Sequence, residues 1–417
     1  MEHYQVVVVG GGPAGALAAA TAARSGAKVL LLERTTRAPA RCTGLISPQA
    51  VELLSIPPSL IREKIRAARV HSPGGRVLEL SSPKTKAYVI DRAGLDRLLL
   101  ARAGEAGVEV RSGVAATGYA EGLVHTTSGK VGCDVLIGAD GPVSSVARWT
   151  GLSRPKELLV GLQAIVRAEP PREQVEVFLG RQLAPGFFAW AVPAGDGELR
   201  VGLATDHGKA AGELLDRLLA TRFPQAEVVA KVAGLIPIGP PPSTTAGRVL
   251  LVGDAAGQVK PISGGGLYFG AICAQLAGRL AAQGPSALQR YEKSWRNAIG
   301  KELSFGLRAR RVLKNLSDED IDRAFSVLND GKLLEFIAEQ ADIDRHSALL
   351  GKVLGKPALW GRFLQLVQAL GGWRRVRKLL SGLPQDKGNP KLRLWPRREK
   401  VDPRARSLLG ALGGLVS

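Results

Sequence analysis

The sequence predicts an α/β protein, and three observations lead to that prediction. The chain has 417 residues, 45% of them hydrophobic and 23% charged, which is long enough for two globular domains. Residues 4–9 form a continuous apolar, β-branched run, which is typical of a strand buried on both faces of a parallel sheet. An alanine-rich stretch over residues 14–23 favours a helix soon after it. Together these observations predict a Rossmann-type unit near the N-terminus.

Three glycines between this strand and this helix have the spacing G-x-G-x-x-G. Gly10 would make the tight turn, Gly12 would let a pyrophosphate approach the backbone, and Gly15 would let helix and strand pack closely. Ala14 lies at the start of the helix, where free N–H groups and the helix dipole attract phosphate. The alternative is a glycine turn with a structural role only. The order of strand, turn and helix favours a dinucleotide site.

A second strand is expected over residues 28–32, and it ends at Glu33, 18 residues after Gly15. A carboxylate at this position can bind both ribose hydroxyls of a dinucleotide and would repel a 2′-phosphate. Arg34 follows directly and is counted among the expected cofactor-binding residues. These features do not separate FAD from NAD, so later segments must decide between them.

Two later segments resemble motifs of flavoprotein oxidoreductases similar to para-hydroxybenzoate hydroxylase. Residues 134–142, which contain Asp140, resemble the Asp-Gly motif of that superfamily. Residues 247–257, which contain Gly253 and Asp254, resemble its second FAD motif, and here an apolar strand delivers a carboxylate at its C-terminal end. The resemblance implies that FAD is the cofactor and that Asp140 shapes a turn beneath it.

A second alanine-rich helix is expected where Gly265 and Gly266 precede Leu267. Its free N–H groups are another place where an anionic ligand can bind. In the superfamily this helix end faces the flavin ring, whose reduced form is anionic. The resemblance therefore implies that these three residues bind the cofactor.

Within that superfamily, three segments resemble the geranylgeranyl reductase family, which saturates isoprenoid double bonds. Residues 41–44, Arg-Cys-Thr-Gly, resemble its Cys-Gly loop. Residues 88–96 resemble the segment whose arginine, here Arg92, contacts the cofactor. The resemblance also implies an aromatic substrate motif with three substrate-binding residues, Phe188, Trp190 and Pro193.

The chain departs from that substrate motif at three positions. Phe188 replaces the usual tyrosine, Val192 replaces a phenylalanine, and Ala204 replaces the last glycine. The substrate therefore need not be the archaeal lipid, and the missing tyrosine hydroxyl removes one candidate proton donor. Aromatic residues that alternate along a strand are also common in an ordinary sheet core, which is the alternative for Phe188 and Trp190.

Cys42 and Arg92 are the candidate side chains nearest the chemistry. The resemblance places Cys42 beside the flavin ring, as a cofactor contact and a candidate for proton transfer, with Arg41 as a cofactor-binding neighbour that favours its thiolate. The alternative is a small buried hydrophobe. Arg92 would bind a cofactor phosphate or the flavin edge, and the alternative is an ion pair with Asp91 or Asp96.

The C-terminal region is expected to be helical and basic. Residues 345–417 hold 16 Lys and Arg against three Asp and Glu, a net +13 of the total of +20. Apolar residues recur at helical spacing over residues 349–373, and Arg374, Arg375, Arg377 and Lys378 follow. This pattern suits a helix on an anionic membrane surface, and it equally suits a cap packed on the catalytic domain. Nucleic acid is not expected, because the sequence shows no DNA-binding motif.

The expected architecture is a Rossmann-type FAD-binding domain with an inserted antiparallel β-sheet substrate domain and a helical C-terminal region. The FAD-binding domain is expected over residues 1–150 and 247–300. The substrate domain is expected to take residues 66–88 and 151–246, and the basic helical region residues 301–417. Five isolated histidines indicate no metal site. Three scattered cysteines and the lack of a signal peptide favour the cytoplasm, with peripheral membrane attachment left open.

The expected function is reduction of isoprenoid double bonds in a lipid or polyprenyl substrate by hydride transfer from reduced FAD. The electron source stays open between NADPH, ferredoxin and another donor, because no second dinucleotide motif is present. A flavin-dependent monooxygenase or halogenase acting on an aromatic substrate is the main alternative, with Lys84 or Lys86 as a halogenase lysine. A flavoprotein that only tethers to a membrane or partner is the non-enzymatic alternative.

Overall fold

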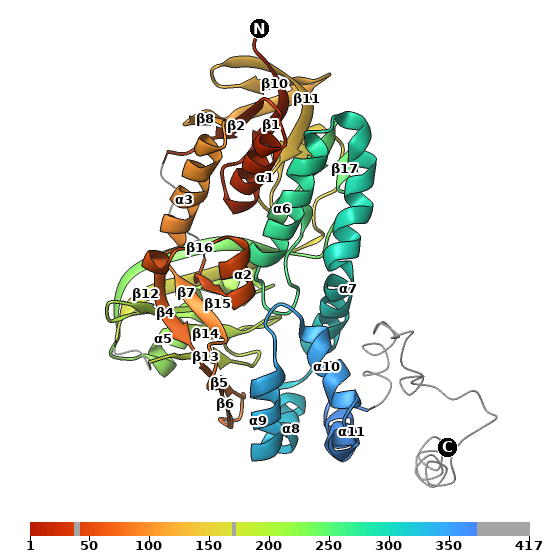
Figure 1. Ribbon diagram of the computed structural model, residues 1–417. Coiled ribbons are helices and arrows are strands. Elements are labelled where there is room, and N and C mark those ends of the chain that lie inside the picture. Colours follow the sequence, from red (N-terminus) through yellow and green to blue (C-terminus); the bar gives the residue numbers. More distant parts are fainter. Residues whose placement is uncertain (37–41, 169–171, 373–417) are drawn as a thin grey trace, which may run out of the picture.

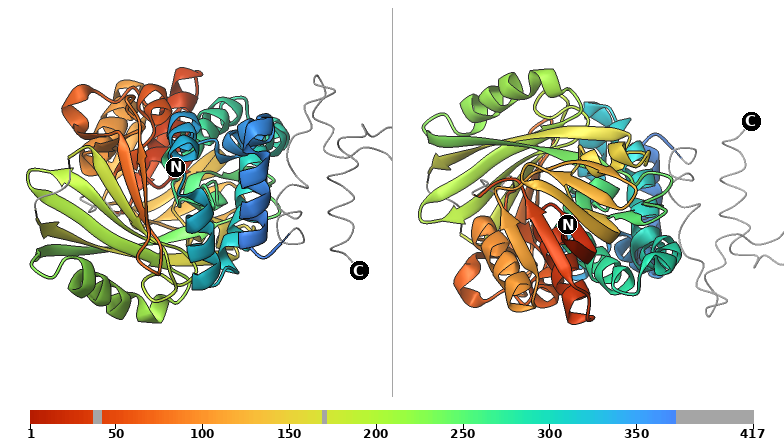
Figure 2. Two further views of the ribbon diagram at one scale, coloured as in Figure 1. Left: turned by 90° about the horizontal axis from the view of Figure 1, so that it is seen from below. Right: turned by 90° about the horizontal axis from the view of Figure 1, so that it is seen from above.

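The computed structural model describes residues 1–36, 42–168 and 172–372. In Figure 1 an α/β unit lies above a β-rich unit, and a set of helices follows along one side of both. Figure 2 shows the helix α5 on one side of the large lower sheet and the N-terminal elements, in red and orange, on the other side. The arrangement confirms the expected α/β class with a helical C-terminal region.

The α/β unit is built on an eight-stranded sheet with the order β17-β18-β11-β1-β2-β8, and β10 and β9 extend it from β11. The four pairs from β18 to β8 are parallel, as expected for a Rossmann-type sheet. The strands are β1 (His3–Val9), β2 (Val29–Glu33), β8 (Glu109–Ser112), β9 (Ala116–Ala120), β10 (Leu123–Thr126), β11 (Gly129–Gly138), β17 (Thr245–Ala246) and β18 (Val249–Leu251).

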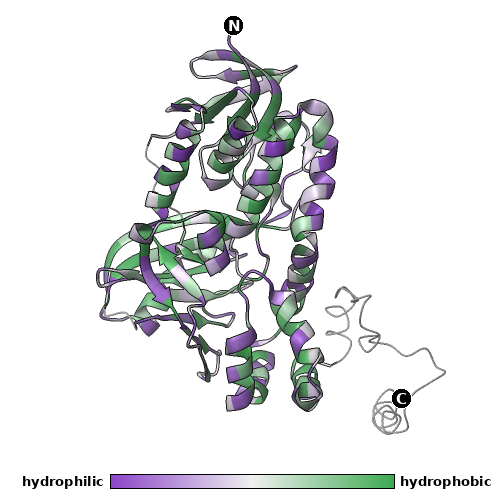
Figure 3. Cartoon of the chain, in the orientation of Figure 1, coloured by the Kyte–Doolittle hydropathy of each residue, from purple (hydrophilic) through white to green (hydrophobic). Residues whose placement is uncertain are grey.

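Residues 6–9 of strand β1 are buried on both faces, as their run of valines predicts. Val6 and Val8 pack with the alanine-rich helices on one face, and Val7 packs with Leu30 and Leu136 on the other. The helices of this unit are α1 (Pro13–Arg24), α3 (Arg92–Glu105), α4 (Ser145–Trp149) and α6 (Leu267–Ala281). Figure 3 shows hydrophobic residues concentrated on the central strands and on α6.

The β-rich unit is a seven-stranded sheet with the order β16-β12-β15-β14-β13-β5-β6. Its pairs are antiparallel except β13 with β5, which are parallel, so the expected antiparallel sheet contains one parallel pair. Leu214, Leu215 and Leu218 of α5 (Ala211–Arg222) cover one face. The strands are β5 (Ala67–His71), β6 (Val77–Ser81), β12 (Glu157–Arg167), β13 (Gln174–Phe178), β14 (Ala189–Gly195), β15 (Glu198–Thr205) and β16 (Glu227–Ile238).

A third sheet has three strands in the order β3-β7-β4, and these strands come between β2 and α3 in the sequence. It consists of β3 (Leu45–Ile46), β4 (Ile61–Ile65) and β7 (Ala87–Ile90), and α2 (Pro48–Leu53) follows β3. Within residues 66–88, β5 and β6 join the large lower sheet, whereas β7 at the end of this segment belongs to the smaller sheet.

The C-terminal helices are α7 (Gln289–Lys314), α8 (Asp318–Leu328), α9 (Gly331–Gln340), α10 (His346–Leu354) and α11 (Trp360–Ala369). The boundary expected between residues 300 and 301 falls inside α7, because the apolar face of this helix continues through Leu303 to Ala309. None of the helices in the described part of the chain is long and apolar enough to cross a membrane. Short 3₁₀ turns lie at η1 (Pro58–Leu60), η2 (Gly208–Ala210), η3 (Gly253–Ala256), η4 (Pro285–Leu288) and η5 (Pro357–Leu359).

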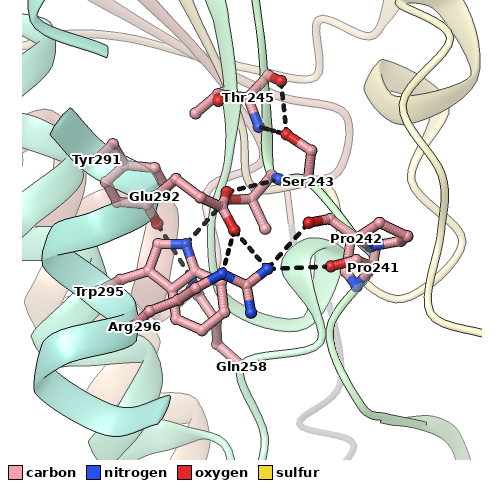
Figure 4. A network of polar contacts seen from close by, with 10 residues as sticks. Pro241, Pro242, Ser243, Thr245, Gln258, Tyr291, Glu292, Trp295 and Arg296 are labelled. Carbon is pink, nitrogen blue, oxygen red and sulfur yellow. Dashed lines mark hydrogen bonds and ion pairs between the residues drawn. The ribbon is translucent and has the colours of Figure 1, made fainter. Parts of the chain in front are cut away.

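Helix α7 is joined to the α/β unit by a buried polar network (Figure 4). One oxygen of Glu292 accepts hydrogen bonds from the Thr244 hydroxyl at 2.6 Å and from the Thr244 N–H at 2.9 Å. The Thr244 hydroxyl in turn accepts from the Trp295 indole at 2.9 Å, and both residues are fully buried. Gln258 donates to the Tyr291 hydroxyl and accepts from the N–H of Gly253. The network therefore ties α7 to η3.

Replacing Thr244 by valine should destabilise the fold. Thr244→Val keeps the side-chain shape but leaves the buried Trp295 N–H without an acceptor, which costs about 1–3 kcal/mol. Urea unfolding followed by circular dichroism measures the difference in the free energy of unfolding. Thr245→Val is the matched control, because Thr245 bonds Ser243 through its backbone. An unchanged stability for Thr244→Val would contradict the role given to this network.

Candidate functional site

The glycine turn between β1 and α1 has the geometry of a phosphate cradle. Gly10 has φ +107°, and a Cβ there or at Gly15 would overlap the carbonyl oxygen of Ala139 or of Gly10, respectively. At Gly12, by contrast, an added Cβ would meet nothing within 4 Å. Gly12 is the N-cap of α1, so this open space lies where the helix N–H groups are free. The backbone is packed tightly at two glycines and left open at the one expected to face the pyrophosphate.

Glu33 lies at the end of β2, next to the same turn. One of its oxygens accepts a hydrogen bond from the Gly11 N–H at 2.7 Å, and the other accepts from the N–H and the hydroxyl of Thr35. The carboxylate is thus held at the carboxyl edge of the parallel sheet, where a ribose would follow the phosphates. Arg34 is exposed beyond it.

Asp140 has the structural role that the resemblance implies. Its carboxylate accepts hydrogen bonds from the Ser144 hydroxyl at 2.6 Å and from the N–H groups of Ser145 and Val146. A carboxylate that binds the N–H groups of a helix start stabilises that start. Asp140 therefore anchors α4 below the turn.

The second motif places Asp254 at the start of η3, against the turn that begins α6. A Cβ at Gly266 would lie 3.0 Å from a carboxylate oxygen of Asp254, and one at Gly253 would lie 2.8 Å from the Cβ of Ala14. Gly253, Gly266 and the α1 start are therefore adjacent. Burial raises the pKa of Asp254 to about 6, and the charge of Arg92 opposes that shift.

Arg92 connects these elements electrostatically. Its guanidinium forms an ion pair with Asp96, which confirms one of the two pairings considered, while Asp91 instead caps α3 by accepting from the Gly94 N–H. Burial lowers the pKa of Arg92, but Cys42, Asp96 and Asp254 together raise it above its ordinary value. Its Nε is buried without a hydrogen-bond partner in the described part of the chain. An acceptor on a bound cofactor would satisfy that N–H.

The Cys42 loop is held by the β-rich unit. The Gln163 amide of β12 donates to the Cys42 carbonyl at 3.4 Å, and the Arg200 guanidinium of β15 donates to the Thr43 carbonyl. The Gly44 N–H donates to the Cys42 sulfur at 3.4 Å. Gly44 has φ +74°, and a Cβ there would lie 2.6 Å from the Ile90 carbonyl oxygen. The backbone path at Cys42 is therefore fixed by Gly44 and by the side chains of Gln163 and Arg200 from the large sheet.

Arg200 and Gln163 are site residues that the sequence analysis missed. Both interrupt otherwise apolar strands, and that interruption is the signal that would have marked them. Burial lowers the pKa of Arg200, while the charges of Cys42, Asp91 and Glu198 act in the opposite direction. Arg41, which was expected to favour the Cys42 thiolate, lies outside the described residues.

An aromatic wall on the large sheet faces the α6 turn. The Phe187 and Phe188 rings are stacked with centroids 4.4 Å apart, and the Trp190 ring meets Phe188 edge-on at 6.0 Å. A Cβ at Gly264 would lie 3.7 Å from the Phe187 ring, so wall and turn are in contact. Alternation along β14 places Pro193 on the opposite sheet face from Trp190.

Two polar atoms remain without partners on this wall. Gly202 of β15 pairs with Trp190 on one side and with Gln163 on the other, so the three residues form one row across the sheet. The Trp190 indole N–H and the Gln163 carbonyl oxygen are both buried and have no hydrogen-bond partner among the described residues. This row of the sheet, close to the Cys42 loop, therefore holds one free donor and one free acceptor.

These contacts test whether the chain fits a bound FAD. The open space at Gly12, the carboxylate at Glu33, the unpaired Arg92 N–H and the free start of α6 are the groups that a dinucleotide with a flavin requires. They come from four separate segments and meet at one edge of the parallel sheet. Among the described residues, no three His, Cys, Asp or Glu side chains are grouped to hold a metal ion.

Comparisons with known proteins agree with this geometry. Residues 3–201 match the model of the FAD binding domain family. The chain is 35% identical over 364 residues to digeranylgeranylglycerophospholipid reductase 2 of Methanothermobacter thermautotrophicus, covering 81% of this chain and 94% of that protein. The chain belongs to the geranylgeranyl reductase family. It is therefore an FAD-dependent oxidoreductase.

Two solved structures share this fold. A geranylgeranyl bacteriochlorophyll reductase-like protein from Thermoplasma acidophilum matches with a TM-score of 0.76 and 25% identity, over 89% of this chain and 100% of that one. The p-nitrophenol 4-monooxygenase from Pseudomonas putida matches with a TM-score of 0.65 and 18% identity, over 81% and 98%. The second likeness shows the fold alone.

Substitution of two glycines should separate cofactor binding from folding. Gly12→Ala adds a methyl group to open space, so the cofactor-free chain should keep its Tm. FAD affinity should fall about tenfold or more, because overpacking against the phosphates costs about 1–3 kcal/mol. Gly15→Ala should lower the Tm even without FAD. Differential scanning fluorimetry and FAD titration measure the two effects, and a lower Tm for cofactor-free Gly12→Ala would contradict the cradle.

The raised pKa of Asp254 predicts a pH-dependent stability. Between its ordinary pKa of about 4 and its folded value of about 6, the folded chain keeps a proton that the unfolded chain has lost. The stability that Asp254 contributes is therefore present below about pH 4 and is lost as the pH rises through 6. Asp254→Asn should raise the Tm of the cofactor-free protein more at pH 7.5 than at pH 5. An equal Tm difference at the two pH values would show that Asp254 titrates normally.

Proposed function

We propose that this protein reduces isoprenoid double bonds of a lipid or polyprenyl substrate. The observation that carries the proposal is the aromatic wall of Phe187, Phe188 and Trp190, in which the Phe187 ring lies against Gly264 of the α6 turn. A long hydrocarbon chain needs an apolar surface, and these rings would supply one next to the proposed position of the flavin ring. The names of the curated relatives, which are reductases of digeranylgeranylglycerophospholipid, support the same substrate class.

The cofactor is the redox agent, because bound FAD in its reduced form supplies a hydride. The chain's own residues position it. In this proposal the α1 start at Gly12 binds the pyrophosphate, Glu33 binds the ribose, and the free Nε of Arg92 donates to the cofactor. The N–H groups at Gly265 and Gly266 face the flavin ring, where negative charge develops on reduction.

The large sheet keeps the reacting double bond away from water. In this proposal Trp190 of β14 and Phe188, which directly precedes that strand, cover the isoprenoid chain, and Cys42 borders it from the loop held by Gln163. Excluding water protects the reduced cofactor and holds the substrate in one position. Cys42 is proposed as a cofactor contact and as the candidate group for moving a proton. Pro193, on the other sheet face, would shape β14 rather than touch substrate.

The halogenase alternative gains no support from its candidate lysines. The Lys86 ammonium donates to the Glu339 carbonyl at 2.7 Å and contacts the Ala341 carbonyl, which directs it to the C-terminal helices. Lys84 is exposed. No observation in the described residues favours oxygen or halogen transfer over reduction.

Membrane docking and the electron donor remain predictions. The apolar residues at helical spacing in the C-terminal region differ in exposure. Val367 is buried in α11, which packs against α8, whereas Trp360 is 52% exposed. This arrangement supports the cap for the part of the region that holds Val367. The cations at residues 374–378 lie outside the described residues. NADPH, ferredoxin or another donor would have to reach the cofactor transiently.

An anaerobic product assay tests the proposed function. The FAD-loaded protein is reduced with dithionite and incubated with geranylgeranyl diphosphate or a geranylgeranylated lipid. Each reduced double bond should add about 2 Da to the substrate mass while the flavin is reoxidised. Trp190→Ala and Cys42→Ala should bind FAD yet lose about 100-fold in rate, because a misplacement of about 1 Å has that effect.

Trp190→Phe is the matched control, since it keeps an aromatic ring in the wall while it removes the five-membered part of the indole with its N–H. A rate near that of the wild type for this variant assigns the loss in Trp190→Ala to the wall. Unchanged substrate and flavin that stays reduced would contradict the reductase. In that case, an assay in air that finds oxygen or halogen incorporated into an aromatic substrate would support the monooxygenase or halogenase alternative.

A further inference from the structure

A buried ion pair joins the C-terminal helices to the expected flavin site. Lys260, in the loop between η3 and α6, donates to a carboxylate oxygen of Asp344 at 2.6 Å and to the Ile343 carbonyl at 2.8 Å. Lys260 is 7% exposed and Asp344 only 1%. In Figure 1 the connection from α9 to α10, which holds Asp344, rises from the helical region into the middle of the molecule. The C-terminal helical region therefore places the charged Asp344 side chain beneath the loop between η3 and α6.

The Lys260 ammonium lies directly against the α6 turn. The Lys260 N–H donates to the Gly265 carbonyl at 3.1 Å, and the Gly264 N–H donates to the Lys260 carbonyl at 2.9 Å. A Cβ at Gly265 would lie 2.9 Å from the Lys260 Cε and 3.3 Å from its Nζ. The turn proposed to face the flavin thus closes over a buried cation.

The Lys260 ammonium and the Asp344 carboxylate neutralise each other only while both side chains are present. The second carboxylate oxygen of Asp344 is buried without a hydrogen-bond partner among the described residues. His346 lies nearby, but burial lowers its pKa to about 4, so it is neutral at pH 7. Asp342 faces the same segment and binds the N–H groups of Asp344 and Arg345. Removing either Lys260 or Asp344 would leave the other as an uncompensated buried charge.

We propose that Lys260 is a positioning residue through which the C-terminal helical region sets the reduction potential of the bound flavin. The pair holds the turn over residues 264–266 and fixes the net charge beneath it. Reduced flavin carries a negative charge that oxidised flavin lacks, so a nearby unpaired cation favours the reduced form and an unpaired anion disfavours it. The inference rests on the proposed position of the flavin at this turn.

Two single variants should move the midpoint potential in opposite directions. Lys260→Met leaves the Asp344 carboxylate unpaired and should weaken binding of reduced relative to oxidised FAD about tenfold, which lowers the potential by about 30 mV for a two-electron couple. Asp344→Asn leaves the Lys260 ammonium unpaired and should raise the potential by a similar amount. The double variant should return close to the wild-type value. Anaerobic titration of the FAD-loaded proteins against a reference dye at pH 6.5 measures all four.

Lys86→Met is the matched control. Lys86 also binds the C-terminal region, through the carbonyls of Glu339 at the end of α9 and of Ala341 just after it. Unlike Lys260, it does not lie against the turn over residues 264–266. Removal of the Lys86 ammonium should therefore leave the midpoint potential unchanged. If Lys260→Met does not retain FAD, Lys260→Gln takes its place, because the amide can still donate to the Ile343 carbonyl.

The proposal requires that the two single variants shift the midpoint potential in opposite directions. A purely structural pair would weaken FAD binding or lower the Tm in both single variants without opposite shifts in potential. Shifts of the same sign, or none in protein that retains FAD, would overturn the inference. The potential is measured without an isoprenoid substrate, so it is independent of whether the protein reduces double bonds. A failed product assay with opposite potential shifts would remove the proposed function and leave this inference standing.

Discussion

The site depends on one guanidinium that is largely shielded from solvent. Arg92 lies at the start of α3, and the groups that raise its pKa against the effect of burial include Asp96 on its own helix, Asp254 of η3 and Cys42 of the loop before β3. A buried cation is tolerated only when its partners are held close to it. This requirement brings α3, the second motif and the cysteine loop to one point, and each of them contributes a group to the cofactor site.

The second sheet defines the reactive side of that point. Gln163 and Arg200 donate to two successive carbonyls, of Cys42 and Thr43, so the path of the cysteine loop follows the position of β12 and β15. Gly202 lies between Gln163 and Trp190 in one row of the sheet, and a Cβ at Gly202 would lie 2.5 Å from the Cβ of Gln163. The large sheet thus carries Trp190 of the aromatic wall and also supports the Cys42 loop.

Local features of the site could be predicted from the sequence, and long-range pairings could not. The turn at Gly10–Gly15 and the carboxylate of Glu33 follow from strand, helix and spacing, because a few neighbouring residues determine them. Lys260 and Asp344 are 84 residues apart, and nothing in either local pattern indicates that they meet. The boundary expected at residue 300 lies within α7 because the helical periodicity continues across it.

The strand order of the first sheet has a consequence for the order of events during synthesis. β11 is flanked by β1 on one side and by β18 on the other, and β18 is made about 110 residues after β11 ends. Between these moments one edge of a strongly apolar parallel sheet lacks its neighbour, and α1 lacks the α6 surface against which it packs. Unpaired edges of this kind are prone to aggregation. The intervening residues form the large lower sheet, so a nascent chain must complete the second unit before it can close the first.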